Sequence, residues 1–202
     1  MYSLELILAS ASPRRADLLK QLGLPFKVLA SSIDERELSQ KEEVEQLALA
    51  KAKSVAEKVP AGIVLGADTI VLCNGQILGK PQDEAEAKKM LAFLSGKSHQ
   101  VVTGVAVVRA EDGFFLTSRE ETEVIFRELD EKEINYYIST GEPLDKAGAY
   151  GIQGKGALLV QAIHGCYYNV VGLPLVRVFQ LLQQAGYSPW LEATRKEAVI
   201  EG

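Results

Sequence analysis

The 202-residue sequence is poor in the residues that build cross-linked or metal-centred folds, because it holds only two cysteines and two histidines. Cys73 and Cys166 are too few for a disulfide framework, and we interpret them as reduced thiols of a cytosolic protein. His99 and His164 stand alone, so no Cys/His spacing predicts a zinc site. The fold must then rest on its own core, and a chain of this length can bury roughly 70% of its unfolded surface.

The sequence also lacks an excess of positive charge and any long apolar run. Its net charge of −5 argues against broad nucleic-acid binding, although a local cluster of Lys and Arg could still bind a small polyanion. No apolar run approaches the roughly 18 residues of a membrane-spanning helix, and the N-terminus lacks the basic region of a signal peptide. We therefore expect a cytoplasmic protein without nucleic-acid or membrane partners.

Several widespread catalytic motifs are absent. The sequence contains no Gly-x-x-x-x-Gly-Lys-Ser/Thr loop and no Gly-x-Gly-x-x-Gly after a predicted strand. No Gly-x-Ser-x-Gly motif or Cys/His pair supports a covalent nucleophile. These absences exclude P-loop nucleotide hydrolases, dinucleotide-binding folds and hydrolases of the serine or cysteine type.

What the sequence does hold is an alternation of strand and helix patterns, followed by a hairpin. The patterns predict strands over 4–8, 26–30, 63–72, 76–78, 101–108, 114–126 and 157–163. They predict helices over 13–22, 41–58, 84–94, 131–140 and 175–184, with Asp83 as one N-cap and Asp130 with Glu133 as a capping box. This order predicts an α/β fold in which helices flank a mixed sheet.

Two segments fall outside this pattern. The glycine-rich stretch 141–156 reads as a long loop, and a loop of that length inside a compact domain is usually functional. Residues 191–202 are charged and predict a frayed tail behind a single domain over 1–190.

The first predicted helix starts in a way that favours anion binding. Ser12 fits the N-cap position and Pro13 the first helical position. Arg14 and Arg15 follow at the positive end of the helix dipole, where cations cost roughly 0.3–1 kcal/mol each. The alternative is a solvated basic turn, but a bound phosphate would offset this cost better.

Asp68 lies in the middle of the most hydrophobic predicted strand. A carboxylate there costs several kcal/mol unless it is paired or bound to a metal. The small neighbours Gly66 and Ala67 predict open space beside it, which favours a functional carboxylate over an Asp that merely caps a turn.

Other polar residues leave two interpretations open. From local sequence alone, Lys80 reads as a surface lysine and Lys51 as a helix lysine whose ammonium reaches water. Asp34 and Glu35 form either a solvated loop or a ligand pair for Mg²⁺ or Mn²⁺. Gln153 could bond to backbone, or its amide could pair with N3–H and O4 of uracil or thymine.

Five segments in order resemble the Maf family of nucleoside triphosphate pyrophosphatases, once described as septum-formation inhibitors. They are 9–15 (ASASPRR), 66–69 (GADT), 79–81 (GKP), 145–154 (DKAGAYGIQG) and 171–174 (VGLP), and the resemblance covers about residues 4–185. The form of 145–154 is similar to the branch that acts on dTTP and UTP rather than the branch that acts on 7-methyl-GTP.

The resemblance implies a two-lobed α/β fold around a central cleft, like that of the inosine triphosphate pyrophosphatases, and suggests a homodimer. It makes Asp68 the proton acceptor and assigns base specificity to Arg14, Thr69 and Gln153. It implies that a further set of residues binds the nucleotide or its phosphates: Ser12, Arg15, Lys51, Lys80, Asp145 and Lys146. Glu35 and Asp68 would be the metal ligands.

The expected reaction is hydrolysis of dTTP and UTP, or of modified pyrimidine nucleotides, to the monophosphate and pyrophosphate with a divalent metal, Mg²⁺ or Mn²⁺. Two alternatives remain open at this point. One is a nucleotide-binding regulator of cell division with little catalysis, and the other is a pyrophosphatase for another modified nucleotide.

Overall fold

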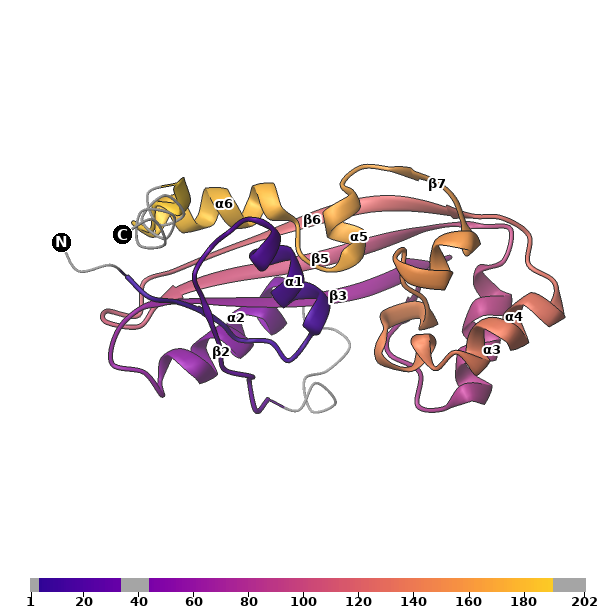
Figure 1. Ribbon diagram of the computed structural model, residues 1–202, viewed down its shortest axis with the longest axis horizontal. Helices are drawn as coiled ribbons and strands as arrows, with labels where there is room; N and C mark the ends of the chain where they lie inside the picture. Colours follow the sequence, from indigo (N-terminus) through magenta and orange to yellow (C-terminus); the bar gives the residue numbers. More distant parts are fainter. Residues whose placement is uncertain (1–3, 34–43, 191–202) are drawn as a thin grey trace, which may run out of the picture. The chain divides into compact units, whose positions relative to one another are not determined.

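A seven-stranded mixed sheet forms the framework of the computed structural model, which describes residues 4–33 and 44–190 (Figure 1). The strands are β1 (Leu6–Leu8), β2 (Lys27–Val28), β3 (Ile63–Cys73), β4 (Gln76–Leu78), β5 (Ser98–Arg109), β6 (Phe115–Phe126) and β7 (Val160–His164). Their order is β2-β1-β3-β5-β6-β7, and β4 pairs with β3. Strand β1 is parallel to β2 and β3, whereas β4 is antiparallel to β3 and β7 to β6. The predicted mixed sheet is confirmed.

Helices flank the sheet, as the sequence predicts. They are α1 (Pro13–Gln21), α2 (Val44–Ala56), α3 (Glu84–Leu94), α4 (Glu131–Ser139), α5 (Tyr167–Val171) and α6 (Leu175–Gln184). Asp83 caps α3 through its side chain, and Asp130 and Glu133 form the predicted capping box of α4. Within the described ranges, no helix has the length and apolar character needed to cross a membrane.

The structure departs from the prediction in a few places. The predicted loop over 141–156 is built largely from 3₁₀ turns, which are Glu142–Asp145, Ala147–Ala149 and Gly154–Leu159. The third turn includes the first residues of the predicted strand over 157–163. Glycines in left-handed conformations precede the first turn at 141, lie inside the second at 148 and begin the third at 154. Helix α5 has only five residues, too short for a periodic pattern to reveal it. The predicted tail over 191–202 and the first residues of the helix over 41–58 lie outside the described part.

Two compact units make up the chain. The first contains residues 1–68, 104–119 and 172–202, and the second contains residues 69–103 and 120–171. In the first unit, α2 packs through Ala48, Ala52 and Val55 against strand residues such as Ile7 and Val64. Ile63, Val64 and Leu65 are all buried in β3, and because successive side chains point to opposite faces, both faces of this strand are covered.

The core of the second unit lies under α3 and α4, which contact one another. Its buried members come from the strands, from both helices and from the 3₁₀ segment, and include Leu91, Phe126, Tyr137 and Tyr150. The 3₁₀ segment is therefore fixed in the core through Tyr150 rather than lying on the surface as a loose connection.

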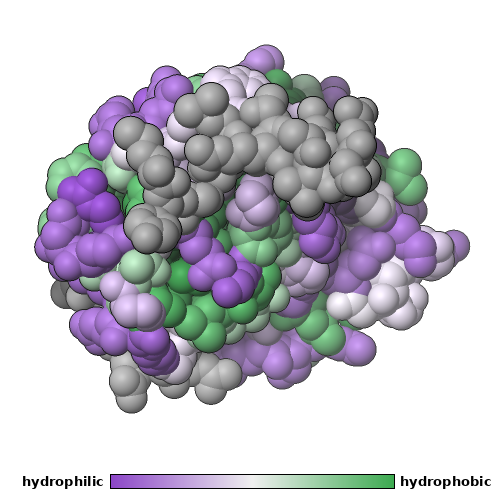
Figure 2. All heavy atoms as spheres, turned by 60° about the vertical axis from the view of Figure 1, so that its left-hand side comes forward, coloured by the Kyte–Doolittle hydropathy of each residue, from purple (hydrophilic) through white to green (hydrophobic). Residues whose placement is uncertain are grey.

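At the molecular surface, hydrophobic residues lie in patches between hydrophilic ones on the face that Figure 2 shows.

Candidate functional site

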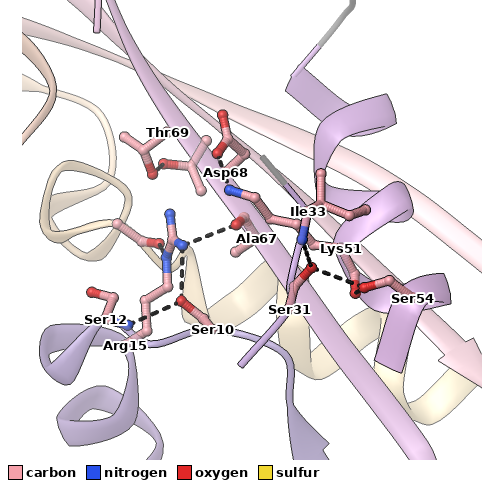
Figure 3. Close-up of polar contacts among 12 residues, drawn as sticks. Ser10, Ser12, Arg15, Ser31, Ile33, Lys51, Ser54, Ala67, Asp68 and Thr69 are labelled. Carbon is pink, nitrogen blue, oxygen red and sulfur yellow. Dashed lines mark hydrogen bonds and ion pairs between the residues drawn. The ribbon is translucent and has the colours of Figure 1, made fainter. Parts of the chain in front are cut away.

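A buried ion pair occupies the middle of β3. Asp68 is 8% exposed, and Lys51 on α2 is 6% exposed. The Lys51 ammonium lies 2.5 Å from Oδ1 of Asp68 (Figure 3). Oδ2 of Asp68 accepts no hydrogen bond from the residues that the structure describes. The pair therefore holds one carboxylate oxygen in place and leaves the other for chemistry. The interpretation of Lys51 from local sequence, as a lysine that reaches water, is wrong.

Gly66 has a different role from the one that the sequence predicts. A Cβ atom at this position would lie 2.2 Å from the backbone oxygen of Ala48 and 3.0 Å from the Cβ of Ala52. The glycine thus creates no open space beside Asp68, because α2 fills it. Instead, Gly66 lets α2 approach β3 closely enough for Lys51 to reach Asp68.

Arg15 connects three segments of the first unit. Its Nε donates to the carbonyl oxygen of Gly172 at 2.8 Å, and its Nη1 donates to Ala67 O at 2.9 Å and to Ser10 Oγ at 3.1 Å (Figure 3). These contacts join the motifs over 9–15, 66–69 and 171–174. They use three of the five guanidinium donors and hold the backbone directly beside Asp68.

The start of α1 has the conformation of an N-cap without its usual hydrogen bond. Ser12 has extended backbone angles and Pro13 follows at the first helical position, but the Ser12 side chain makes no capping bond. Its backbone N–H donates to Ser10 Oγ at 3.2 Å. The first turn contains no acidic residue and includes Arg14 and Arg15. The predicted basic helix start therefore exists, with the Ser12 hydroxyl half-buried beside it.

The predicted metal ligand Glu35 lies outside the described residues, as does Asp34. Ile33, directly before them, donates its N–H to Ser31 Oγ, which pairs with Ser54 Oγ of α2 at 2.8 Å (Figure 3). Across residues 4–33 and 44–190, no three His, Cys, Asp or Glu side chains gather as metal ligands. The open Oδ2 of Asp68 nevertheless fits Mg²⁺ or Mn²⁺, since such ions often use one or two carboxylates and complete their shell with substrate phosphates and water.

In the second unit, Lys80 lies beside the segment that carries three other predicted residues. The backbone N–H of Gly148 donates to the carbonyl oxygen of Gly79 at 3.0 Å. This bond joins the motifs over 79–81 and 145–154. Lys80 is exposed, as the sequence predicts for a lysine after a hairpin.

Asp145, Lys146 and Gln153 differ in their surroundings although they share one segment. Lys146 Nζ donates to Asp145 Oδ1 at 2.6 Å and to the carbonyl oxygen of Glu142 at 2.5 Å. The Gln153 side chain is exposed and makes no capping bond to the 3₁₀ turn that it precedes. Lys146 therefore stabilises the segment itself, and Gln153 is the member whose amide faces solvent.

Tyr150 of this segment and its partner His99 on β5 form a buried contact that was not predicted from the sequence. His99 is 3% exposed, and its Nε2 lies 2.7 Å from the hydroxyl of Tyr150. Burial lowers the pKa of His99 to about 4 and raises that of the Tyr150 hydroxyl. A single histidine inside a strand pattern gives little indication of such a contact, because its partner is 51 residues away.

Thr69 also has a buried partner that the sequence did not reveal. Its Oγ1 lies 2.9 Å from Oγ1 of Thr103 on β5, and Thr103 is fully buried. Thr103 interrupts a run of valines in its strand, which is the one trace of this contact in the sequence. Thr69 itself is half-buried.

Comparisons with known proteins show the family of the chain. The model of a family described as Maf-like protein matches residues 5–185. A dTTP/UTP pyrophosphatase of Moorella thermoacetica is 57% identical over 189 residues, which cover 92% of this chain and 97% of the relative. A dTTP/UTP pyrophosphatase of Symbiobacterium thermophilum is 56% identical over 186 residues, 91% and 95% of the two chains. A third, of Bacillus cytotoxicus, is 55% identical over 88% of this chain and 94% of its own length.

Proposed function

Because the chain belongs to the Maf-like protein family, we propose that it hydrolyses dTTP and UTP to the nucleoside monophosphate and pyrophosphate. The relatives that carry this activity in their names match almost the whole chain. The single observation that carries the proposal is the state of Asp68, a buried carboxylate with Oδ1 held by Lys51 and Oδ2 open.

Asp68 acts as the general base in this proposal. A water molecule attacks the α-phosphorus and gives its proton to Oδ2 of Asp68, while the bond to the bridging oxygen breaks and pyrophosphate leaves. Lys51 keeps the carboxylate in one orientation, because its ammonium donates to Oδ1. General bases of this kind contribute roughly 10²–10⁴-fold to rate.

The basic start of α1 binds the phosphates. Ser12 and Arg14 contribute a hydroxyl and a guanidinium, and the first N–H groups of the helix contribute further donors. Arg15, the next residue of the same turn, is proposed to contact a phosphate as well, while its Nε and Nη1 donate to protein oxygens. Charge-assisted hydrogen bonds of about 1.5–3 kcal/mol each outweigh the cost of placing these cations at a helix start.

A divalent cation, Mg²⁺ or Mn²⁺, would be held by Asp68 together with Glu35, and Oδ2 of Asp68 can serve both the cation and the proton because it has two lone pairs. When bound, the cation would neutralise phosphate charge and polarise the attacking water. In the second unit, Lys80 and the Lys146–Asp145 pair are proposed nucleotide contacts. Gln153 is proposed to select the base, since its carbonyl can accept N3–H of uracil or thymine while its NH₂ donates to O4. Cytosine presents the reverse pattern, which predicts a preference of roughly 5- to 150-fold against CTP.

The experiment is a triphosphate panel assayed with the full chain and Mg²⁺ or Mn²⁺ for pyrophosphate, orthophosphate and monophosphate. UTP and dTTP should yield monophosphate and pyrophosphate. In Asp68→Asn, kcat for UTP should fall by roughly 10²–10⁴-fold, because the amide cannot take the proton. Asp112→Asn, in an exposed turn of the same unit, is the matched control and should stay near wild type.

Each contrary result has a distinct meaning. Activity of Asp68→Asn within a few-fold of wild type would remove Asp68 from the role of base. Release of orthophosphate would place the cleavage at the γ-phosphate. Tight nucleotide binding without turnover would favour the alternative of a nucleotide-binding regulator of cell division. Turnover confined to a modified or purine nucleotide would change the substrate but not the reaction.

A further inference from the structure

A chain of buried polar groups lies behind Thr69 in the second unit. Thr103 on β5 and Asn169 on α5 are both fully buried. The hydroxyl oxygens of Thr69 and Thr103 are 2.9 Å apart, and distance alone leaves open which of them donates. The Thr103 hydroxyl also donates to the backbone carbonyl oxygen of Asn169 at 3.2 Å. Thr69 is thus connected to a carbonyl group deep in the unit.

Asn169 is itself held in one orientation. Its Nδ2 donates to the carbonyl oxygen of Val101 and to Thr122 Oγ1, both at 2.9 Å. The Val101 carbonyl can only accept, so the amide nitrogen and not the oxygen must face it. Thr122 in turn exchanges hydrogen bonds with the backbone of Cys166 at 3.1 and 3.2 Å. These contacts fix the place of the Asn169 backbone that Thr103 meets.

The number of hydroxyl protons gives the direction of the hydrogen bonds that link Thr69, Thr103 and Asn169. A carbonyl oxygen has no proton, so Thr103 must use its only hydroxyl proton on Asn169. The Thr103 oxygen can then only accept, and the proton between the two threonines must come from Thr69. Whatever else the Thr69 oxygen contacts, its one proton is committed to Thr103. Thr69 can therefore meet a ligand only as a hydrogen-bond acceptor.

We infer that Thr103 and Asn169 are positioning residues that make Thr69 an obligatory acceptor toward a donor group of the nucleotide. This inference rests on the proposed function, because it adds the polarity of one contact to that substrate. The donor must occur in both dTTP and UTP, and two groups qualify. One is the 3′-hydroxyl of the sugar, and the other is N3–H of the base, whose one proton Thr69 would then share with the carbonyl oxygen of Gln153. A fixed acceptor rejects a ligand that places an acceptor opposite it, as CTP does at N3.

The test compares Thr103→Val with Thr103→Ser. Valine has nearly the shape of threonine without the hydroxyl, whereas serine keeps the hydroxyl. We would measure kcat/KM for UTP, CTP, N3-methyl-UTP and 3′-deoxy-UTP, and calorimetric affinities for UMP and its N3-methyl and 3′-deoxy analogues. In Thr103→Val, Thr69 can turn its proton toward a ligand, so the preference for UTP over the analogue that lacks the donor should fall by about fivefold. Thr103→Ser should keep the wild-type ratio within about twofold.

The analogues identify the donor. A drop in the ratios to CTP and N3-methyl-UTP assigns the contact to N3–H, and a drop in the ratio to 3′-deoxy-UTP assigns it to the sugar. The inference is wrong if folded Thr103→Val keeps the wild-type preference for UTP over every analogue. It is also wrong if Thr103→Ser loses the same preference as Thr103→Val. If Thr103→Val does not fold, Thr69→Val against Thr69→Ser decides, because only the valine should lose the ratio.

The proposed function can fail separately. A wild-type protein that binds UMP but does not hydrolyse UTP would contradict the proposed reaction, and the UMP affinities would still test the polarity. A protein that binds none of these nucleotides would overturn both.

Discussion

Two helices of this protein begin in opposite ways. Helix α4, in the second unit, begins with a complete capping box, in which Asp130 accepts from the Glu133 N–H at 2.8 Å and Glu133 accepts from the Asp130 N–H at 2.9 Å. Helix α1, in the first unit, begins at Ser12 without a side-chain cap and continues with two arginines and no acid. The first start combines a side-chain cap with acidic residues, whereas the second keeps a preferred N-cap residue and Pro13 but lacks the capping bond and places cations at the positive end of the helix.

The buried polar groups repeat this contrast. The first unit buries a full ion pair, Lys51 with Asp68, which costs desolvation energy. The second unit buries the imidazole of His99 against the hydroxyl of Tyr150, and burial favours its neutral form. Positions that break the rules of stability are expected at functional sites. The contrast therefore predicts that changes at these positions of the first unit lower activity, and at the ion pair stability as well, whereas changes at these positions of the second unit lower stability alone.

The largest effect should come from breaking the buried ion pair. Lys51→Met leaves Asp68 buried without its partner, so the free energy of unfolding in urea should fall by about 3–5 kcal/mol, and turnover should fall with it. Lys53→Met, on the exposed side of the same helix, is the matched control and should change stability by less than about 1 kcal/mol.

The double variant Lys51→Met with Asp68→Asn separates stability from activity. It removes both charges, so it should recover part of the stability while remaining inactive. A single variant Lys51→Met that unfolds like the wild type would show that the pair contributes nothing to the fold, and the contrast between the units would then lose its main support.

The second effect is a dependence of stability on pH that originates in the second unit. His99 has a pKa of about 4 in the folded protein, whereas an unfolded histidine titrates near 6.5. The unfolded chain thus binds a proton that the folded chain refuses, so the stabilisation is complete above about pH 6.5 and declines as the pH falls toward about 4. The full loss is about 3 kcal/mol, of which about 2 kcal/mol should appear between about pH 7.5 and about pH 5.

Urea unfolding at the two pH values measures this loss. His99→Gln should remove it while keeping a hydrogen-bonding group near Tyr150, and the exposed His164→Gln should retain the wild-type dependence. If the free energy of unfolding falls by the same amount between the two pH values in the wild type and in His99→Gln, another group governs the sensitivity to acid.

The fold was largely predictable because its elements carry local information. Strand β3, the hairpin that follows it, both aspartate caps and helix α6 lie where the sequence pattern predicts them. The 3₁₀ segment was not predictable, since its turns depend on glycine conformations and on the burial of Tyr150 in the core.

Candidate site residues could be selected from the sequence, but the contacts that these residues make could not. Asp68 stood out because a carboxylate interrupts an apolar strand. Its partner Lys51 could not be identified from periodicity, because helix and strand meet only in three dimensions. Arg15 was expected to bind phosphate, and nothing in its local sequence indicated that it would donate to Gly172, which is 157 residues away. Long-range hydrogen bonds of this kind leave no local pattern.

The smallest effect would test the two helix starts directly. Asp130→Ala removes the capping box of α4 and should lower the free energy of unfolding by about 1 kcal/mol, with kcat/KM for UTP within about twofold of wild type. Ser12→Ala removes a hydroxyl that caps nothing, so stability should change by less than about 0.5 kcal/mol. The same change should raise KM for UTP by roughly fivefold, through the loss of one hydrogen bond to phosphate.

Both variants would be measured by urea unfolding and by initial rates on UTP. Each serves as the control for the other, since both replace an N-cap residue by alanine. If Ser12→Ala instead loses stability and keeps its KM, the start of α1 is an ordinary helix start whose capping bond forms in solution. The two units would then no longer differ in what their helix starts do, and the phosphate-binding role of Ser12 would have to be abandoned, while the proposed role of Asp68 would stand on its own geometry.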